Sequence, residues 1–405
     1  MTGRQPVIVA AVRSPIGRAF KGSLAGLRPD DMSAQVISAL LARTPEVTPA
    51  LIDDIVWGCA SPAGEQGYNI ARVAGLLCGL TEVPATTVNR FCASSLQAVR
   101  MAAHAIAAGE ADVVVAGGVE SVSHFTQGCA DEMPGTHNAR FAEAERRSAS
   151  RATDGAGAWA PAEGLPDIYI AMGQTAENVR RLCGVTREAM DGFALRSQER
   201  AVQSQDDGFF DAEIVPLTLA DGTVVSRDDS PRRGSNLEAM AQLKPAFHPH
   251  GEVTAGNSCP LNDGAAAVLV MSRERAAALG LAPRGRVVAS AVSALDPEIM
   301  GLGPVEACRK VLARAGMTIA DVDLVEINEA FAAQAIPCAE QLGVSDDRLN
   351  VHGGAIALGH PFGMTGARIM TTLLHGLEAA DATVGLESMC VGGGQGMAMI
   401  VERLS

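Results

Sequence analysis

Two kinds of apolar spacing alternate along the chain. Short runs rich in β-branched and aliphatic residues predict strands over 6–12, 54–58, 85–88, 112–116, 262–271, 286–294, 322–327, 383–390 and 397–402. Between them, apolar residues at helical spacing predict helices over 31–42, 69–78, 92–108, 173–182, 187–204, 304–315 and 367–377. The alternation predicts an α/β fold, built from βαβ units around a mostly parallel sheet.

The order of elements near the C-terminus repeats an order found in the first half. After Gly366 a helix leads into strand 383–390, a glycine cluster and strand 397–402. In the first half, the helix of Cys92 leads into strand 112–116, but the matching last strand, 265–271, follows only after a long interruption. The simplest explanation is a duplicated α/β unit whose first copy contains a large insertion.

The interrupting segment has a different character from the rest of the chain. Residues 141–164 are rich in Ala, Ser, Glu and Arg and show little periodicity, which predicts an exposed excursion.

Composition narrows the class of protein. A chain of 405 residues predicts two or three domains, and 47% hydrophobic residues with only 3% aromatics predict an aliphatic core. The net charge of −14 argues against nucleic acid as a partner. A small polyanionic ligand would need arginines gathered locally.

The cysteines predict a reduced, intracellular protein. There are nine (59, 78, 92, 129, 183, 259, 308, 338 and 390), they are scattered, and none forms a CxxC pair. No histidine or acid spacing matches a metal ligand set. The first ten residues lack the build of a signal peptide, and no apolar run has the length of a membrane span. We therefore expect a cytoplasmic protein without a metal, and no membrane as a partner.

Cys92 is a candidate nucleophile. It follows strand 85–88 and is expected to open a helix, where unpaired N–H groups and the helix dipole favour a thiolate over a thiol. A buried structural cysteine is the alternative, because free cysteine is among the most buried residue types.

His360 lies in the stretch of the chain that is densest in glycine and histidine. Glycines on both sides allow a close approach of backbone to ligand, and Pro361 stiffens the turn. The stretch lacks the Gly-Lys-Ser/Thr of a phosphate loop and the G-x-G-x-x-G of a dinucleotide site. A structural histidine in a tight turn is the alternative.

A second cysteine and an asparagine stand where strands end. Cys390 ends strand 383–390 and precedes a glycine cluster, and Asn328 follows strand 322–327. Ligands bind at the ends of strands in α/β sheets. Two thiols, a histidine and exposed backbone N–H groups suggest nucleophilic acyl transfer.

At these residues the chain resembles a known family. Its sequence is similar to the thiolases, acetyl-CoA C-acyltransferases, from Val7 to Leu404, and four signatures carry the similarity: Asn89–Ser95, Asn328–Phe331, Gly359–Pro361 and Cys390–Gly394. The resemblance implies a five-layered αβαβα fold of two similar halves, with a loop domain inserted in the first. It implies a division into residues 1–122 and 260–283 (first half), 123–259 (inserted loop domain, binding CoA) and 284–405 (second half).

The resemblance also implies roles. Cys92 would be the acylated nucleophile, His360 would help to form its thiolate, and Cys390 would be the acid and base at carbon. Asn328 would hold a water that forms one oxyanion hole with His360, and the N–H groups of Cys92 and Gly392 would form the other. The reaction would be reversible, CoA-dependent cleavage of 3-ketoacyl-CoA to acetyl-CoA and a shortened acyl-CoA.

Contacts to CoA are implied at six positions. These are Arg232 for the nucleotide, Met172 and Phe331 along the pantetheine and acyl path, and Ala255, Gly256 and Cys259 beside the thioester. Coenzyme A is then a substrate and no cofactor is required. A homodimer or homotetramer is expected.

The chain also departs from many short-chain thiolases. It has Ala171 where they have histidine, Ala239 and Cys259 where they have serine, and Ala-Ser-Ser after Cys92. We expect a degradative enzyme, as in fatty-acid β-oxidation, acting on a medium-chain, branched or ring-derived acyl group. The alternatives are a biosynthetic acetoacetyl-CoA thiolase and a thiolase-like subunit that binds acyl-CoA without turnover.

Overall fold

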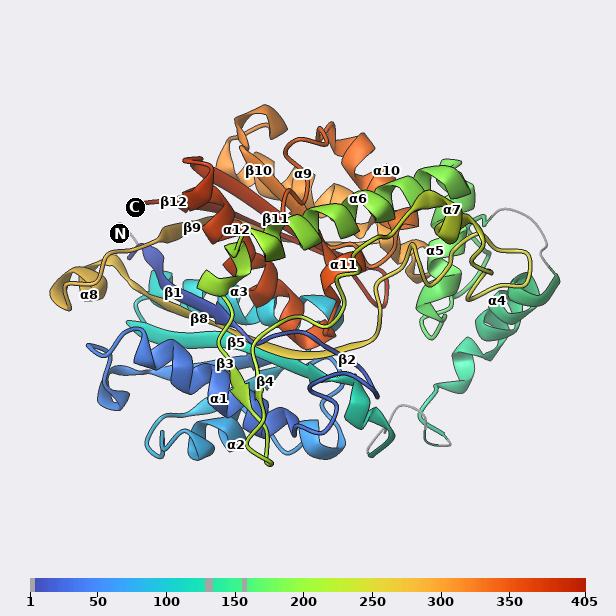
Figure 1. Ribbon diagram of the computed structural model, residues 1–405. Coiled ribbons are helices and arrows are strands. Elements are labelled where there is room, and N and C mark those ends of the chain that lie inside the picture. Colours follow the sequence, from blue (N-terminus) through green and yellow to red (C-terminus); the bar gives the residue numbers. More distant parts are fainter. Residues whose placement is uncertain (1–3, 128–132, 134, 155–158) are drawn as a thin grey trace.

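The computed structural model describes residues 4–127, 133, 135–154 and 159–405 (Figure 1). Its strands are β1 (Pro6–Arg13), β2 (Gly17–Arg18), β3 (Asp54–Gly58), β4 (Ala85–Val88), β5 (Val113–Ser121), β6 (Leu217–Thr218), β7 (Val224–Val225), β8 (Asn262–Ser272), β9 (Gly285–Ala294), β10 (Leu324–Ile327), β11 (Val384–Val391) and β12 (Gln395–Arg403). Its helices are α1 (Pro29–Ala42), α2 (Ile70–Leu77), α3 (Ser94–Ala108), α4 (Ala142–Asp154), α5 (Met172–Cys183), α6 (Arg187–Asp206), α7 (Leu237–Ala241), α8 (Arg273–Ala278), α9 (Gly303–Ala315), α10 (Ala332–Leu342), α11 (Ala355–Leu358) and α12 (Thr365–Ala379).

The main sheet is mixed, so the prediction of a mostly parallel sheet is wrong. Its strand order is β10-β11-β12-β9-β1-β8-β5-β3-β4, with β2 beside β8. Parallel pairing is confined to β3 with β4 and β5, and to β10 with β11. The remaining pairs are antiparallel, because β12 returns from β11 through a glycine turn and β8 returns beside β5 after the insertion.

The predicted repeat is present in the strand pairing. The order β3-β5-β8-β1 in the first half corresponds to β10-β11-β12-β9 in the second, and each pair has the same relative direction. Between the halves, β1 pairs β9 only at Val7–Arg286 and Ile8–Gly285. Figure 1 shows the first half below and the second above, with the two termini close together.

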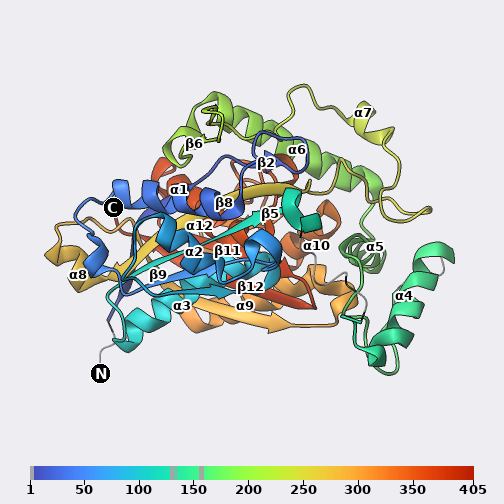
Figure 2. The same cartoon turned by 90° about the horizontal axis from the view of Figure 1, so that it is seen from below.

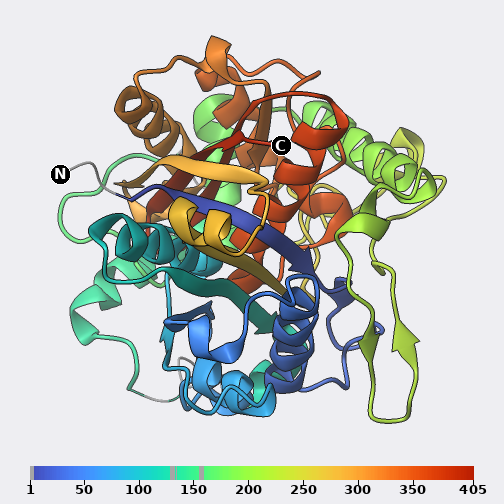
Figure 3. The same ribbon diagram turned by 90° about the vertical axis from the view of Figure 1, so that its left-hand side faces the viewer.

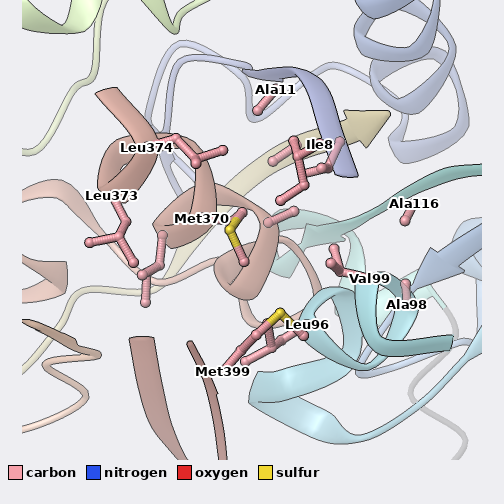
Figure 4. Packing of buried hydrophobic residues seen from close by; sticks show 14 of the residues in the cluster. Ile8, Ala11, Leu96, Ala98, Val99, Ala116, Met370, Leu373, Leu374 and Met399 are labelled. Carbon is pink, nitrogen blue, oxygen red and sulfur yellow. The ribbon is translucent and has the colours of Figure 1, made fainter. Parts of the chain in front are cut away.

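Three buried apolar clusters define five layers. One cluster joins α3 and α12 to the inner faces of both half-sheets, through residues such as Leu96, Met370 and Met399 (Figure 4). A second lies between α1, α2 and the outer face of the first half-sheet, and a third between α9, α10 and the outer face of the second. The order is therefore helix, sheet, helix, sheet, helix, as the family resemblance implied. Burial of aliphatic surface on both sides of each sheet stabilises it.

The helices α4, α7, α8, α10 and α11 were not predicted from the sequence, and the two longest of them, α4 and α10, show why. Part of 141–164 is not irregular but forms α4, which buries only a narrow face, at Ala144 and Ser148, and stands at the edge of the molecule (Figure 2). The helix α10 contains Pro337, a residue that normally interrupts a helical pattern. Its buried side, rich in alanine, holds the helix against the second half-sheet despite the proline.

Buried ion pairs anchor the inserted segment to the first half. Arg13, at the end of β1, donates to Glu213 at 2.9 Å and to both oxygens of Asp228 at 2.8 and 3.0 Å. Asp228 also accepts the Ile16 N–H at 2.8 Å, and Arg13 is completely buried. Near this anchor the β6–β7 hairpin extends along the surface (Figure 3).

Removing the charge of Asp228 should therefore destabilise the protein. We expect Asp228→Asn to lower the free energy of unfolding by about 3 kcal/mol, because it leaves a buried guanidinium partly uncompensated. Urea denaturation measures the change. The matched control is Asp206→Asn, which breaks an exposed pair with Arg233 in the same segment and should leave the transition unchanged. Equal midpoints for the two variants would contradict the anchoring role.

Candidate active site

Cys92 lies in a short 3-10 turn, η3 (Phe91–Ala93), and α3 begins two residues later at Ser94. The sequence placed it at the helix start itself. Side chains fix the turn: Asn89 Oδ1 accepts the Phe91 N–H at 2.7 Å, and the Ser94 hydroxyl donates to the Phe91 carbonyl at 2.7 Å. The turn packs against β11 and against a second 3-10 turn, η10 (Phe362–Met364). Cys92 is thus held where the two halves meet.

A cavity of about 490 Å³ opens beside Cys92. Its described walls come from both halves and from the inserted segment, and they include Phe91, Ile168, Tyr169, Met172, Phe362 and Gly392. The lining is mainly apolar and aromatic, which suits an apolar group attached to the cysteine.

Burial raises the pKa of the Cys92 thiol to about 12, although the backbone N–H groups of Gly392 and of Cys92 itself act in the opposite direction. The expectation that the helix start favours the thiolate is therefore wrong for the resting protein. Desolvation outweighs the N–H groups, so the thiol keeps its proton until a base removes it. Those N–H groups still point at the position where negative charge would develop.

His360 has a defined tautomer. The Thr365 hydroxyl donates its single proton to the Pro361 carbonyl at 2.8 Å, so at 2.6 Å from His360 Nδ1 it must accept. Nδ1 therefore carries the proton, and the Nε2 lone pair accepts from the Asn328 side-chain amide at 3.3 Å. Burial, aided by the charge of Arg368, lowers the pKa of His360 to about 3. The imidazole is neutral and can act as a base through Nε2.

Two residues that the sequence analysis did not identify hold the His360 loop. Asn262 of β8 accepts the His360 N–H at 3.0 Å, and a Cβ on Gly359 would lie 2.6 Å from the Asn262 side chain, so this glycine is required. Glu120, at the end of β5, accepts the N–H groups of Gly363 and Ala60 at 2.8 and 2.9 Å. A carboxylate at the end of an otherwise apolar strand was the signal that could have indicated Glu120.

Asn328 and Cys390 complete the group from the second half. Asn328 is buried, its N–H donates to the Ser388 carbonyl at 2.9 Å, and its Oδ1 has no partner among the described residues. Burial raises the pKa of the Cys390 thiol well above its usual value, and Cys92, Cys338 and Cys259 would raise it further in their thiolate forms. Cys390 therefore has three other cysteines close enough to interact with it.

The residues predicted to contact CoA occupy three places. Arg232, Ala255 and Gly256 line a second cavity of about 160 Å³. Met172 lines the cavity beside Cys92. Cys259 and Phe331 lie on adjoining backbone: the Cys259 N–H donates to the Ala330 carbonyl at 3.1 Å, and the Phe331 ring packs edge-on against Phe247 at 5.8 Å.

A buried charge cluster, which no local sequence pattern indicates, adjoins the site. Glu326 and Glu387 face each other in register on β10 and β11, and Arg368 of α12 interacts with both. Burial raises the pKa of Glu326 to about 8 and that of Glu387 well above its usual range. Both carboxyl groups are thus shifted toward their protonated forms, and the charge of Arg368 disfavours the imidazolium form of His360.

Within the described residues, no cluster of three or more histidine, cysteine or acidic side chains is arranged to hold a metal ion. In the same part of the chain, no helix combines the length and apolarity needed to cross a membrane.

Comparisons with known proteins agree along the whole chain. The family model described as thiolase, N-terminal domain, matches residues 6–274, and that described as thiolase, C-terminal domain, matches residues 281–403. A 3-ketoacyl-CoA thiolase of Vibrio cholerae is 46% identical, and a beta-ketoadipyl-CoA thiolase of Acinetobacter baylyi is 45% identical; each match covers 98% of this chain and 99% of the relative. The crystal structure of the Bacillus anthracis acetyl-CoA acetyltransferase superposes with a TM-score of 0.86 at 37% identity, and the match covers both chains completely.

The tautomer of His360 can be tested through Thr365. In Thr365→Val, Nδ1 loses its acceptor, and Nε2 no longer presents its lone pair in a fixed direction. We expect acylation of Cys92 by a thioester to slow by at least about tenfold. The control is Thr371→Val on the same helix, whose hydroxyl donates to the Ala367 carbonyl at 2.8 Å and which is equally buried. Equal slowing in both variants would indicate a loss of packing instead.

Proposed function

Because the chain belongs to the thiolase family, we propose that its Cys92 site cleaves 3-ketoacyl-CoA with CoA, reversibly, to acetyl-CoA and a shortened acyl-CoA. The protein is an acyltransferase that works through an acyl-cysteine. The observation that carries this proposal is the meeting of the Cys92 thiol, the N–H of Gly392 and the Cys390 thiol at the junction of the halves. The η10 turn, which follows the neutral imidazole of His360, packs against the turn of Cys92.

Each group then has a role in two half-reactions. Cys92 gives its proton to Nε2 of His360 and attacks the C3 carbonyl of the substrate. Hydrogen-bond donors at the site stabilise the negative charge that develops on the C3 oxygen. The C2–C3 bond breaks, and the electron pair remains on C2 of acetyl-CoA, where Cys390 supplies a proton. A Cys390 thiol that keeps its proton at rest suits this role. CoA then gives its thiol proton to the Cys390 thiolate and attacks the acyl-cysteine. Cys92 leaves as a thiolate and takes back the proton that His360 holds.

The oxyanions have two sets of donors in this scheme. The N–H groups of Cys92 and Gly392 would bind one of them, as their effect on the Cys92 thiol supports. A water on Asn328, together with His360, would bind the other, and the unpartnered Asn328 Oδ1 supports this water site.

We propose that residues 123–259 form a loop domain that binds CoA, between first-half segments 1–122 and 260–283, with 284–405 as the second half. The cavity lined by Arg232, Ala255 and Gly256 supports the placement of CoA. Coenzyme A is a substrate here, and no other cofactor or nucleic acid is required. We assign the enzyme to the cytoplasm.

The preferred acyl group is a neutral chain longer than acetyl. The cavity beside Cys92 is mainly apolar, and no lysine or arginine stands in its described lining. His137 lines it, but its Nδ1 is already 3.0 Å from Glu145. A terminal carboxylate, as in beta-ketoadipyl-CoA, would be desolvated there without a partner. A cavity of about 490 Å³ exceeds the need of an acetyl group, which disfavours the biosynthetic alternative.

A second copy of the chain is the proposed partner. Strand β4 ends the main sheet, and its outer edge has no neighbour among the described strands. The adjoining helix α2, tied to β4 through Asn69 and Thr87, exposes Leu76 and Leu77, and Tyr68 before it is 97% exposed. An exposed edge with apolar residues beside it fits a homodimer, or a homotetramer built from dimers.

The dimer can be tested by charge insertion. We expect sedimentation velocity to give a multiple of the 41.8 kDa chain, and Leu76→Glu with Leu77→Glu to give the monomer. Leu237→Glu, at an equally exposed leucine of the inserted segment, serves as the control. A wild-type monomer would contradict the proposal.

The activity is tested with purified protein and CoA. We expect cleavage of 3-ketooctanoyl-CoA, with kcat/KM at least about tenfold above that for beta-ketoadipyl-CoA. The assignment of the acyl group fails if the dicarboxylic substrate is preferred or if only acetoacetyl-CoA is cleaved. Cleavage of none of them would support the non-catalytic alternative.

The roles of the two cysteines are tested in the same assay. Cys390→Ala should acquire an acetyl group on Cys92 from acetyl-CoA, visible by mass spectrometry, yet fail to turn over. Cys92→Ser should acquire none, whereas Cys338→Ala, at another buried cysteine, should retain activity. An adduct on Cys92→Ser but not on Cys390→Ala would reverse the two roles.

A further inference from the structure

Phe91, the residue before Cys92, has a strained backbone. Its φ is +44°, a left-handed value that bulky residues rarely adopt. Three hydrogen bonds hold it there: those of the Phe91 N–H and carbonyl to the side chains of Asn89 and Ser94, and the one from the Ala93 N–H to the Arg90 carbonyl at 2.9 Å. Strain of this kind persists where the surroundings fix the conformation, and it commonly occurs at functional sites.

The strained backbone directs the ring of Phe91 onto the glycine turn of the second half. A Cβ on Gly392 would lie 3.3 Å from Phe91 Cγ, and a Cβ on Gly393 would lie 3.8 Å from Phe91 Cε2 and 3.2 Å from Ile168 Cδ1. The ring therefore covers the peptide whose N–H faces the Cys92 thiol. It lines the large cavity, and 44% of the residue is exposed.

This position has a consequence for an acyl group on Cys92. The carbonyl oxygen of this acyl group would accept the Gly392 N–H. The first carbon of the acyl chain, which is bonded to the carbonyl carbon, would then lie next to the Phe91 ring, because this ring covers the Gly392 peptide. Tyr169 lines the same cavity, and its ring stacks on His137 at 3.8 Å. The Phe91 ring thus stands at the root of the chain, and Tyr169 belongs to the part of the wall that the inserted segment forms.

We propose that Phe91 is a specificity-determining residue, which limits the width of the acyl group at the carbon attached to the transferred carbonyl. This inference rests on the proposed function and deepens it. Chains that are straight at this carbon are accepted, including those with a branch or ring farther out. Chains branched there, at C4 of the 3-ketoacyl-CoA, are rejected by contact with the ring.

The experiment compares Phe91→Leu and Phe91→Gly with the wild type on 3-ketooctanoyl-CoA and its 4-methyl derivative. We expect the ratio of kcat/KM, branched over straight, to rise at least about tenfold in Phe91→Leu, since one methyl group in a pocket is discriminated by roughly this factor. Glycine adopts the positive φ without strain, so Phe91→Gly provides a folded variant if leucine does not. Tyr169→Leu, which widens the same cavity away from the root, should leave the ratio unchanged.

A second readout does not depend on CoA. Acylation of Cys92 by p-nitrophenyl butyrate and p-nitrophenyl isobutyrate, followed by mass spectrometry, compares a straight and a branched first carbon directly. The isobutyrate-to-butyrate ratio should rise about tenfold in both Phe91 variants. An unchanged ratio in both would overturn the inference. If the wild type cleaves no 3-ketoacyl-CoA but the acylation ratio still changes in the Phe91 variants, the proposed function is overturned and the inference about Phe91 stands.

Discussion

The contact between the first turns of α3 and α12 fixes the geometry of the whole site. Gly366 approaches α3 so closely that a Cβ there would lie 2.5 Å from Leu96. Beside it, the Ala367 N–H donates to Ser95 Oγ at 2.9 Å. Cys92 lies two residues before α3 and His360 lies five residues before α12, so this contact helps to set the position of the thiol relative to the imidazole. The aliphatic core around the two helices, shown in Figure 4, holds the contact in place.

Burial at this junction keeps the reactive side chains of the resting site uncharged. Desolvation raises the pKa of Cys92 and Cys390 and lowers that of His360, so the two thiols and the imidazole are uncharged at rest. The proton on Nδ1, which Thr365 fixes, leaves Nε2 as a base of known direction. In such a site, negative charge develops on the carbonyl oxygen only when the substrate is bound. Prearranged N–H groups then stabilise that charge strongly, because the local dielectric constant is low.

Much of this site follows from local sequence, and the remainder depends on contacts distant in the chain. Cys92, His360 and Cys390 stand near the ends of predicted elements, the last two among glycines, and a local pattern reveals them. The hydrogen bond from Gly363 to Glu120 joins residues of different halves, and no local pattern encodes it. The same dependence on distant contacts explains why the sheet was wrongly predicted to be mostly parallel. Apolar spacing identifies the strands, but the direction of β8 depends on where the chain returns from the inserted segment. In α10, packing overrides the unfavourable propensity of Pro337.

The duplicated fold accounts for the different duties of its halves. The turns η3, Phe91–Ala93, and η10, Phe362–Met364, each consist of three residues and precede a helix of fifteen. The middle residue is Cys92 in one and Gly363 in the other. A Cβ on Gly363 would lie 2.2 Å from the Val119 carbonyl oxygen, so no nucleophile fits there. The first copy supplies the nucleophile, and the second places His360 just before the equivalent turn. Neither copy alone contains both groups, and the chemistry requires the interface between them.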